Sequence, residues 1–298
     1  PVLRDRINHI WFNVFVHIDS GSSVLGPVHG EQLTERIVNG PYRWNEPFPG
    51  GHARRAGGPA VVPTSDSKNA DGSVGLPAFV LPGGARVVLL SPTGAKLKRM
   101  KSEWLKEVQK AGLVAGEGSS GHNKSPKPRA ASADTEPTLV SRQRLEQLAA
   151  TVERDGSAAN GSSIAFVLEF GDKRLLLGAD AHADVLVASL ARYGQMIGEA
   201  RPRIDVFKLP HHASGANVSN ELISAMDCRR YLISTNGDIY DHPDNTAIAR
   251  AVIGSAGPAR FYCNYLSPRT APWLKRGPPL GADFQIPQPD KPGVRVVV

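Results

Sequence analysis

Three short apolar runs in the second half of the chain each stop at polar side chains, and this pattern limits the fold more than any other feature. The runs with their polar ends span residues 175–180, 204–212 and 231–243. The first ends in a carboxylate, the second in a pair of histidines, and the third leads to a histidine followed by proline. Short apolar runs bounded by turn residues are typical of buried strands.

The segments between these runs are long enough for crossover helices, so the pattern predicts a sheet with mainly parallel strands. The carboxyl ends of such strands face one crevice. We therefore expect Asp180, His211, His212 and His242 to converge there. Carboxylate oxygen and neutral imidazole nitrogen are ordinary zinc ligands, and one carboxylate can bridge two ions. The sequence thus predicts a metal site.

Each of these residues also has an ordinary structural interpretation. An aspartate after a strand is often a helix N-cap, and Asp180 is placed to cap a helix that begins at Ala183. A His-His pair is often half buried without any metal. The order and spacing of the three clusters together favour the metal site over these alternatives.

Apolar periodicity predicts further elements along the chain. It predicts helices over residues 29–38, 96–111 and 141–152, and strands over 9–17, 78–81, 85–90, 164–170, 174–177 and 259–264. Residues 42–76 and 272–292 are expected to be irregular, and 295–298 to add an edge strand. Residues 114–137 have almost nothing to bury and predict a disordered insertion. This predicted insertion separates residues 1–113, a partial first half of one domain, from residues 138–298, the second half of the same domain.

Composition limits the class of protein. With 298 residues, 41% of them hydrophobic, the chain can bury a large core. It has no run of eighteen apolar residues and no secretory pattern near its start, which favours a cytoplasmic protein without a membrane partner. Cys228 and Cys263 are too few for a disulfide framework. The formal charge of +7 favours acidic partners such as nucleic acid, but only weakly, because many lysines lie in one helix and one loop.

The motifs together resemble the second half of metallo-β-lactamase-fold hydrolases, in the branch that includes the C-terminal domain of DNA-uptake competence proteins. The resemblance is carried by Asn-Gly-Ser-Ser-Ile at 160–164, Leu-Leu-Leu-Gly-Ala-Asp-Ala-His at 175–182, Phe-Lys-Leu-Pro-His-His-Ala-Ser at 207–214, Ile-Ser-Thr-Asn-Gly-Asp at 233–238 and His-Pro at 242–243. It covers residues 160–245 closely. It implies an α+β fold, the four-layer αββα sandwich.

The resemblance also implies roles for single residues. Asp180 matches the bridging carboxylate, and His211 and His212 match a histidine pair in which the second is the favoured zinc ligand. His242 matches a histidine at the site mouth that binds metal or contacts substrate, and His182 would support the site from the first turn of the next helix. Ala179 and Ala213 stand where the family more often has glycine.

One departure from the family is large. The principal metal motif, His-x-His-x-Asp-His, is absent from the chain, so we expect poor metal binding and a fold short of its N-terminal strands. One hypothesis is an N-terminally incomplete hydrolase, whose parent uses a zinc-bound hydroxide on a small-molecule or nucleic-acid phosphodiester. The alternative is a non-catalytic remnant that acts as a binding or scaffold module.

Overall fold

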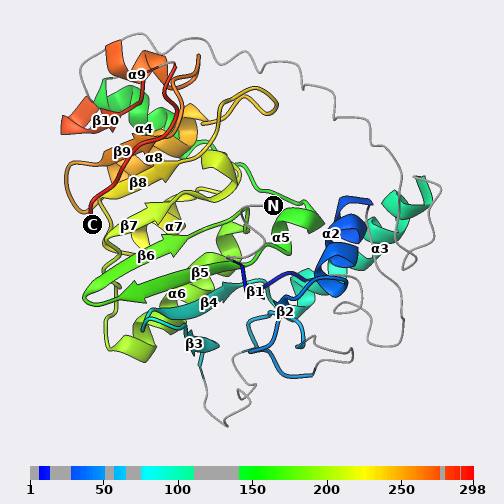
Figure 1. Cartoon of the computed structure of the whole chain (residues 1–298). Coiled ribbons are helices and arrows are strands. Elements are labelled where there is room, and N and C mark those ends of the chain that lie inside the picture. The colour runs from blue at the N-terminus through cyan, green and yellow to red at the C-terminus, as the bar shows by residue number, and fades with distance from the viewer. Residues whose placement is uncertain are drawn as a thin grey trace.

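The computed structural model describes residues 7–13, 28–50, 57–64, 75–110, 141–275, 279–288 and 290–298. Among these residues, an eight-stranded sheet has the spatial order β10-β9-β8-β7-β6-β5-β4-β3 (Figure 1). Its strands are β3 (Ala78–Val80), β4 (Arg86–Ser91), β5 (Ala165–Phe170), β6 (Lys173–Leu177), β7 (Val206–Lys208), β8 (Arg230–Ile233), β9 (Arg260–Cys263) and β10 (Asp283–Gln285). Strands β3 to β6 pair antiparallel and β6 to β10 pair parallel, so the sheet is mixed.

The hairpin of β5 and β6 shows how the sequence specifies this sheet. Gly171 has a φ of 60° at its turn, a left-handed conformation that glycine adopts without steric cost. Val167 pairs with Leu176, and both side chains are fully buried. The strands predicted over residues 164–170 and 174–177 are confirmed as this hairpin, and those predicted over 78–81 and 85–90 pair as β3 and β4.

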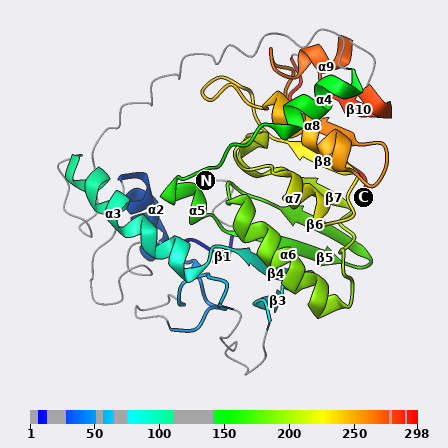
Figure 2. The same ribbon diagram turned by 180° about the vertical axis from the view of Figure 1, so that it is seen from behind.

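Helices cover one face of the sheet, which is the nearer face in Figure 2. Helix α6 packs there through Leu186, Leu190 and Tyr193, which belong to the same buried cluster as Leu176 of the sheet. The helices are α2 (Val28–Val38), α3 (Gly94–Lys110), α4 (Arg142–Ala150), α5 (Ala158–Gly161), α6 (Ala183–Ile197), α7 (Asn220–Ser224), α8 (Asn245–Gly254) and α9 (Ala271–Lys275), with the 3-10 turns η1 (Pro210–Ala213) and η2 (Pro279–Gly281). None of the described helices is long and apolar enough to cross a membrane.

The other face of the sheet carries apolar side chains that are only partly buried. Phe166 and Leu168 of β5 pair with Leu177 and Leu175 of β6, which places all four on that face. Their exposure is intermediate, whereas Val167 and Leu176 on the helix-covered face are fully buried. The central strands are therefore apolar on both faces.

The C-terminal region differs from its predicted irregular structure. Residues 271–275 form α9 and residues 283–285 form β10, which pairs with β9. Trp273 stacks on Phe284, which stacks in turn on Phe261 at a centroid distance of 4.6 Å. This aromatic packing outweighs the local proline and glycine content. Residues 295–298, predicted to add an edge strand, are irregular, and β10 forms the edge of the sheet beside β9.

The N-terminal strand is shorter than predicted. Only His9–Ile10 forms β1, which pairs with β2 (Arg43–Trp44) in a separate two-stranded sheet; residues 14–17 lie outside the described residues. The predicted insertion at 114–137 also lies outside them. Strands β4 and β5, from opposite sides of that segment, pair directly in the large sheet. The described residues thus form an α+β fold.

Candidate functional site

Three loops follow the carboxyl ends of neighbouring parallel strands, and their backbones are strained. The loops after β6, β7 and β8 carry Asp180, the His211–His212 pair and His242. Left-handed φ values occur at five non-glycine positions in these loops: Ala179 (46°), His211 (45°), His212 (57°), Ala213 (67°) and Asp241 (60°). Non-glycine residues avoid this conformation, and such strain concentrates at functional sites.

His211 is held through one ring nitrogen. Its Nδ1 lies 2.9 Å from Oδ1 of Asn217. The Asn217 amide nitrogen donates to Asp155 and to the carbonyls of Asp180 and Ala181, so the Asn217 oxygen faces the ring. An amide oxygen only accepts, so this contact places the proton of the neutral His211 ring on Nδ1. The nitrogen of Asn160 lies farther from Nδ1, at 3.4 Å, and donates to Asp155 at 2.7 Å. Nε2 of His211 then has a free lone pair.

His212 and His242 are held in the same way. Nδ1 of His212 contacts the carbonyl oxygen of Ser234, and Nδ1 of His242 lies 3.1 Å from a carboxylate oxygen of Asp244. Burial acts to raise the pKa of Asp244, but the bonds from His242 and from the Gly215 N–H hold that pKa below its ordinary value. Both oxygens are acceptors, so Nδ1 carries a proton in both histidines, and in the neutral ring Nε2 has a free lone pair.

The three rings lie close together. Ring centroids are 5.3 Å apart for His211 and His242, and 6.2 Å apart for His211 and His212. No described residue hydrogen-bonds to Nε2 of any of the three. Metal-binding histidines are commonly anchored through one nitrogen while the other binds the ion. The arrangement can present lone pairs to a cation or accept a proton.

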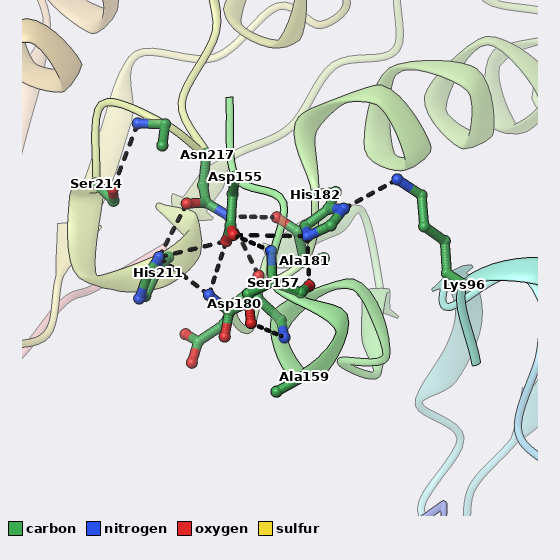
Figure 3. Close-up of polar contacts among 12 residues, drawn as sticks. Lys96, Asp155, Ser157, Ala159, Asp180, Ala181, His182, His211, Ser214 and Asn217 are labelled. Carbon is green, nitrogen blue, oxygen red and sulfur yellow. Dashed lines mark hydrogen bonds and ion pairs between the residues drawn. The ribbon is translucent and has the colours of Figure 1, made fainter. Parts of the chain in front are cut away.

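Asp180 is near this cluster but does not act as a helix cap. In Figure 3 its carboxylate points away from Asp155 and Asn217. The N-cap of α6 is His182, so the interpretation of Asp180 as N-cap is wrong. Burial lowers the pKa of Lys208, and the negative charge of Asp180 opposes that shift.

His182 faces other groups. Its Nε2 lies 2.9 Å from the Ser157 carbonyl oxygen and its Nδ1 lies 2.9 Å from Nζ of Lys96, so both nitrogens are engaged. Burial, and then the charge of Lys96, lower its pKa and favour the neutral ring. His182 is the N-cap of α6 and so lies before the first helical turn, not within it as predicted. Neither of its ring nitrogens is left for a ligand.

A cavity of about 510 Å³ lies beside His182. Lys96, Asp155, Asp184 and Arg250 contribute to its wall, and none of the three clustered imidazoles does. Asp155 therefore borders both this cavity and the surroundings of His211.

The described residues contain no group of three or more His, Cys, Asp or Glu side chains arranged to hold a metal ion. The anchored imidazoles are the right kind of donor for zinc, but structural sites use four ligands and catalytic sites three with water. The described residues thus do not bring enough donors around one point to complete a coordination shell.

Several residues at the site were not found from the sequence. Asp155, Asn217 and Asp244 support the imidazoles, yet none follows an apolar run. Asp155 and Asn217 are 62 positions apart. Comparison with family models, with curated proteins and with solved structures found no match to this chain.

Proposed function

We propose that this chain belongs to a metal-dependent hydrolase of the metallo-β-lactamase type that acts on a phosphodiester, and that His211, His212, His242 and Asp180 contribute part of its metal site. The remaining ligands would have to come from outside the described residues. A divalent cation such as zinc would supply Lewis-acid activation of water there.

The observation that carries this proposal is the common anchoring of three imidazoles. His211, His212 and His242 come from two different loops, and each has its Nδ1 bonded to an oxygen acceptor and its Nε2 free. A buried histidine with a purely structural role usually has a hydrogen-bond partner in the protein at each ring nitrogen. His182 is an example. Three Nε2 atoms that no described residue engages, gathered in one cluster, favour a ligand.

The fold part of the proposal is supported by the partly buried apolar face of the sheet. Phe166, Leu168, Leu175 and Leu177 lie on that face, and Leu232 lies on the same face of β8, beyond Lys208 of β7. A sheet that is apolar on both faces is typical of one covered on both sides. We propose that a second sheet, of which β1 and β2 are a part, covers this face in a four-layer αββα sandwich.

The incomplete donor set favours a second candidate, a non-catalytic binding or scaffold module. Such a module would keep the fold and the imidazole cluster while lacking a metal that activates water. The two candidates differ in turnover, so binding and hydrolysis must be measured separately.

The test uses the purified chain after dialysis against a chelator. Zinc is titrated in and bound metal is measured by calorimetry and plasma mass spectrometry, and hydrolysis of bis(p-nitrophenyl) phosphate is then followed. We expect zinc binding that His212→Ala weakens at least about tenfold, because a ligand is lost. His9→Ala, at an exposed histidine outside the cluster, is the matched control and should change nothing.

The outcomes separate the candidates. Zinc-dependent hydrolysis that His212→Ala removes would support the hydrolase. Zinc binding without hydrolysis would support the binding module. Equal zinc affinity in the His212→Ala and His9→Ala variants would contradict a metal site at these imidazoles.

A further inference from the structure

Asp155 is a buried carboxylate in the irregular segment between α4 and α5. Its side chain is 9% exposed. It accepts hydrogen bonds from the Ser157 N–H at 2.8 Å, from Asn160 Nδ2 at 2.7 Å and from Asn217 Nδ2 at 2.9 Å. Burial acts to raise the pKa of Asp155, and these bonds outweigh it and hold that pKa below its ordinary value. Asp155 is thus an ionised acceptor.

Two histidines lie on either side of this carboxylate (Figure 3). Nδ1 of His211 is 3.7 Å from Oδ2, and Nε2 of His182 is 3.8 Å from Oδ1. Neither distance is that of a direct hydrogen bond. Asn217 makes the closer connection, because its nitrogen bonds to Asp155 and its oxygen to Nδ1 of His211, each at 2.9 Å. The nitrogen of Asn160 bonds to Asp155 at 2.7 Å and lies 3.4 Å from the same Nδ1.

The orientation of the Asn217 amide decides the tautomer of His211. Asn217 is fully buried, and its Nδ2 is surrounded by acceptors only: Asp155 Oδ2, the Asp180 carbonyl at 3.3 Å and the Ala181 carbonyl at 3.2 Å. Turning the amide over would place its oxygen against a carboxylate and two carbonyls. Buried polar groups left without a partner destabilise the folded state, and charged groups do so more strongly. The amide is therefore locked.

We propose that Asp155 is a positioning residue for His211: acting through Asn217, it fixes the Nδ1–H tautomer and keeps Nε2 of His211 unprotonated toward the imidazole cluster. The role of His211 as a metal ligand rests on the proposed function. The assignment of its tautomer does not. Asp155 contacts no reacting group and acts only by orienting the amide.

The test is direct. Long-range ¹H–¹⁵N correlations on histidine-labelled protein, recorded at about pH 8 where an ordinary imidazole is neutral, report which nitrogen of each ring carries the proton. In the unsubstituted protein we expect Nδ1–H for His211. In Asp155→Asn, which keeps the shape but adds a donor, the Asn217 amide loses its strongest orienting acceptor. We expect His211 to shift toward the Nε2–H tautomer.

Internal and external controls accompany this measurement. His212, anchored by the Ser234 carbonyl, should keep its tautomer in Asp155→Asn. Asp172→Asn, at a side chain that is 79% exposed, should alter neither ring. Zinc affinity should fall about tenfold in Asp155→Asn, which is typical of losing a supporting hydrogen bond, and stay constant in Asp172→Asn.

Two results would overturn the inference. One is an Nε2–H tautomer for His211 in the unsubstituted protein, a measurement that needs no variant to fold. The other is an unchanged His211 tautomer in folded Asp155→Asn. If the tautomer behaves as expected but the chain neither binds zinc nor hydrolyses a phosphodiester, the role of Asp155 stands and the proposed function fails.

Discussion

Nζ of Lys96 lies 2.9 Å from Nδ1 of His182, so the first turn of α3 is bonded directly to the residue at which α6 begins. An ammonium group only donates, so Nδ1 of His182 accepts and its Nε2–H donates to the Ser157 carbonyl. The same ammonium lies 2.9 Å from the carboxylate of Asp184. One lysine thus connects α3, which precedes residues 111–140, to the start of α6, which follows them.

Replacing Lys96 with methionine should destabilise the fold. The substitution keeps the aliphatic stem but leaves Nδ1 of the buried His182 without a donor. We expect a loss of about 1–2 kcal/mol in the free energy of unfolding, measured by urea denaturation. Lys98→Met, at an exposed lysine of the same helix, is the matched control and should change stability by less than about 0.5 kcal/mol. Equal effects of the two substitutions would show that the contact with His182 contributes nothing.

Arg250 of α8 should matter more. The residue is 3% exposed. Its guanidinium donates to the carbonyls of Gly215 and Val218 at 2.6 Å each, to that of Ala149 at 3.2 Å, and to that of Thr151. It thereby joins the end of α4 to the loop after the histidine pair. Arg250→Met would leave several buried carbonyls unpaired, so we expect a loss of about 3 kcal/mol or more.

The matched control for Arg250 is Arg142→Met. Among the residues that the structure describes, Arg142 pairs only with Glu146, one turn along the exposed face of α4. Such pairs contribute about 0.3–0.5 kcal/mol. Thermal and urea unfolding of the two variants should therefore differ clearly, and similar midpoints would argue against a supporting role for Arg250.

Much of the fold follows from local pattern. Short alternating runs around Gly171, and the stripe of apolar residues in α3, predict the β5–β6 hairpin and the helix because the backbone period decides which side chains share a face. The histidines of the site were predictable for a similar reason, since they come directly after strands whose ends share one sheet edge.

The remaining features depend on contacts that no local pattern encodes. Asp155 reaches Asn217 across 62 positions, and Lys96 reaches His182 across 86. Residues 272–292 contain the turn formers that normally break structure, yet Trp273 and Phe284 fold back onto Phe261. Tertiary packing of this kind outweighs local propensity and cannot be derived from the order of residues alone.

The two cysteines should be unreactive in the folded protein. Burial raises the pKa of Cys228 to about 12 and that of Cys263 to about 12, from an ordinary value of 9.0. At about pH 8 the thiolate, which is the reactive form, is then roughly a thousandfold rarer than in the unfolded chain. A disulfide reagent such as dithionitrobenzoate should label neither thiol in buffer and both in urea.

The same shift has a consequence for stability. A pKa that is raised on folding means that the folded state favours the neutral thiol. This contribution to the free energy of unfolding is complete below about pH 9 and is lost as the pH rises toward 12. Rapid labelling of either cysteine under native conditions at about pH 8 would contradict the burial of that side chain.

Gly178 allows the ends of β6 and β7 to approach each other beside the site. A Cβ at this position would lie 2.9 Å from the Lys208 carbonyl oxygen and 3.1 Å from the Pro210 nitrogen, and these backbone atoms cannot rotate away. Gly178→Ala must therefore separate the two strand ends and stretch the bond from the His211 N–H to the Ala179 carbonyl, now 2.8 Å. Overpacking of this kind costs about 1–3 kcal/mol. Gly94→Ala, where a Cβ meets nothing within 4 Å, should leave stability the same or slightly higher, and equal urea midpoints for both variants would show that the strand ends tolerate separation.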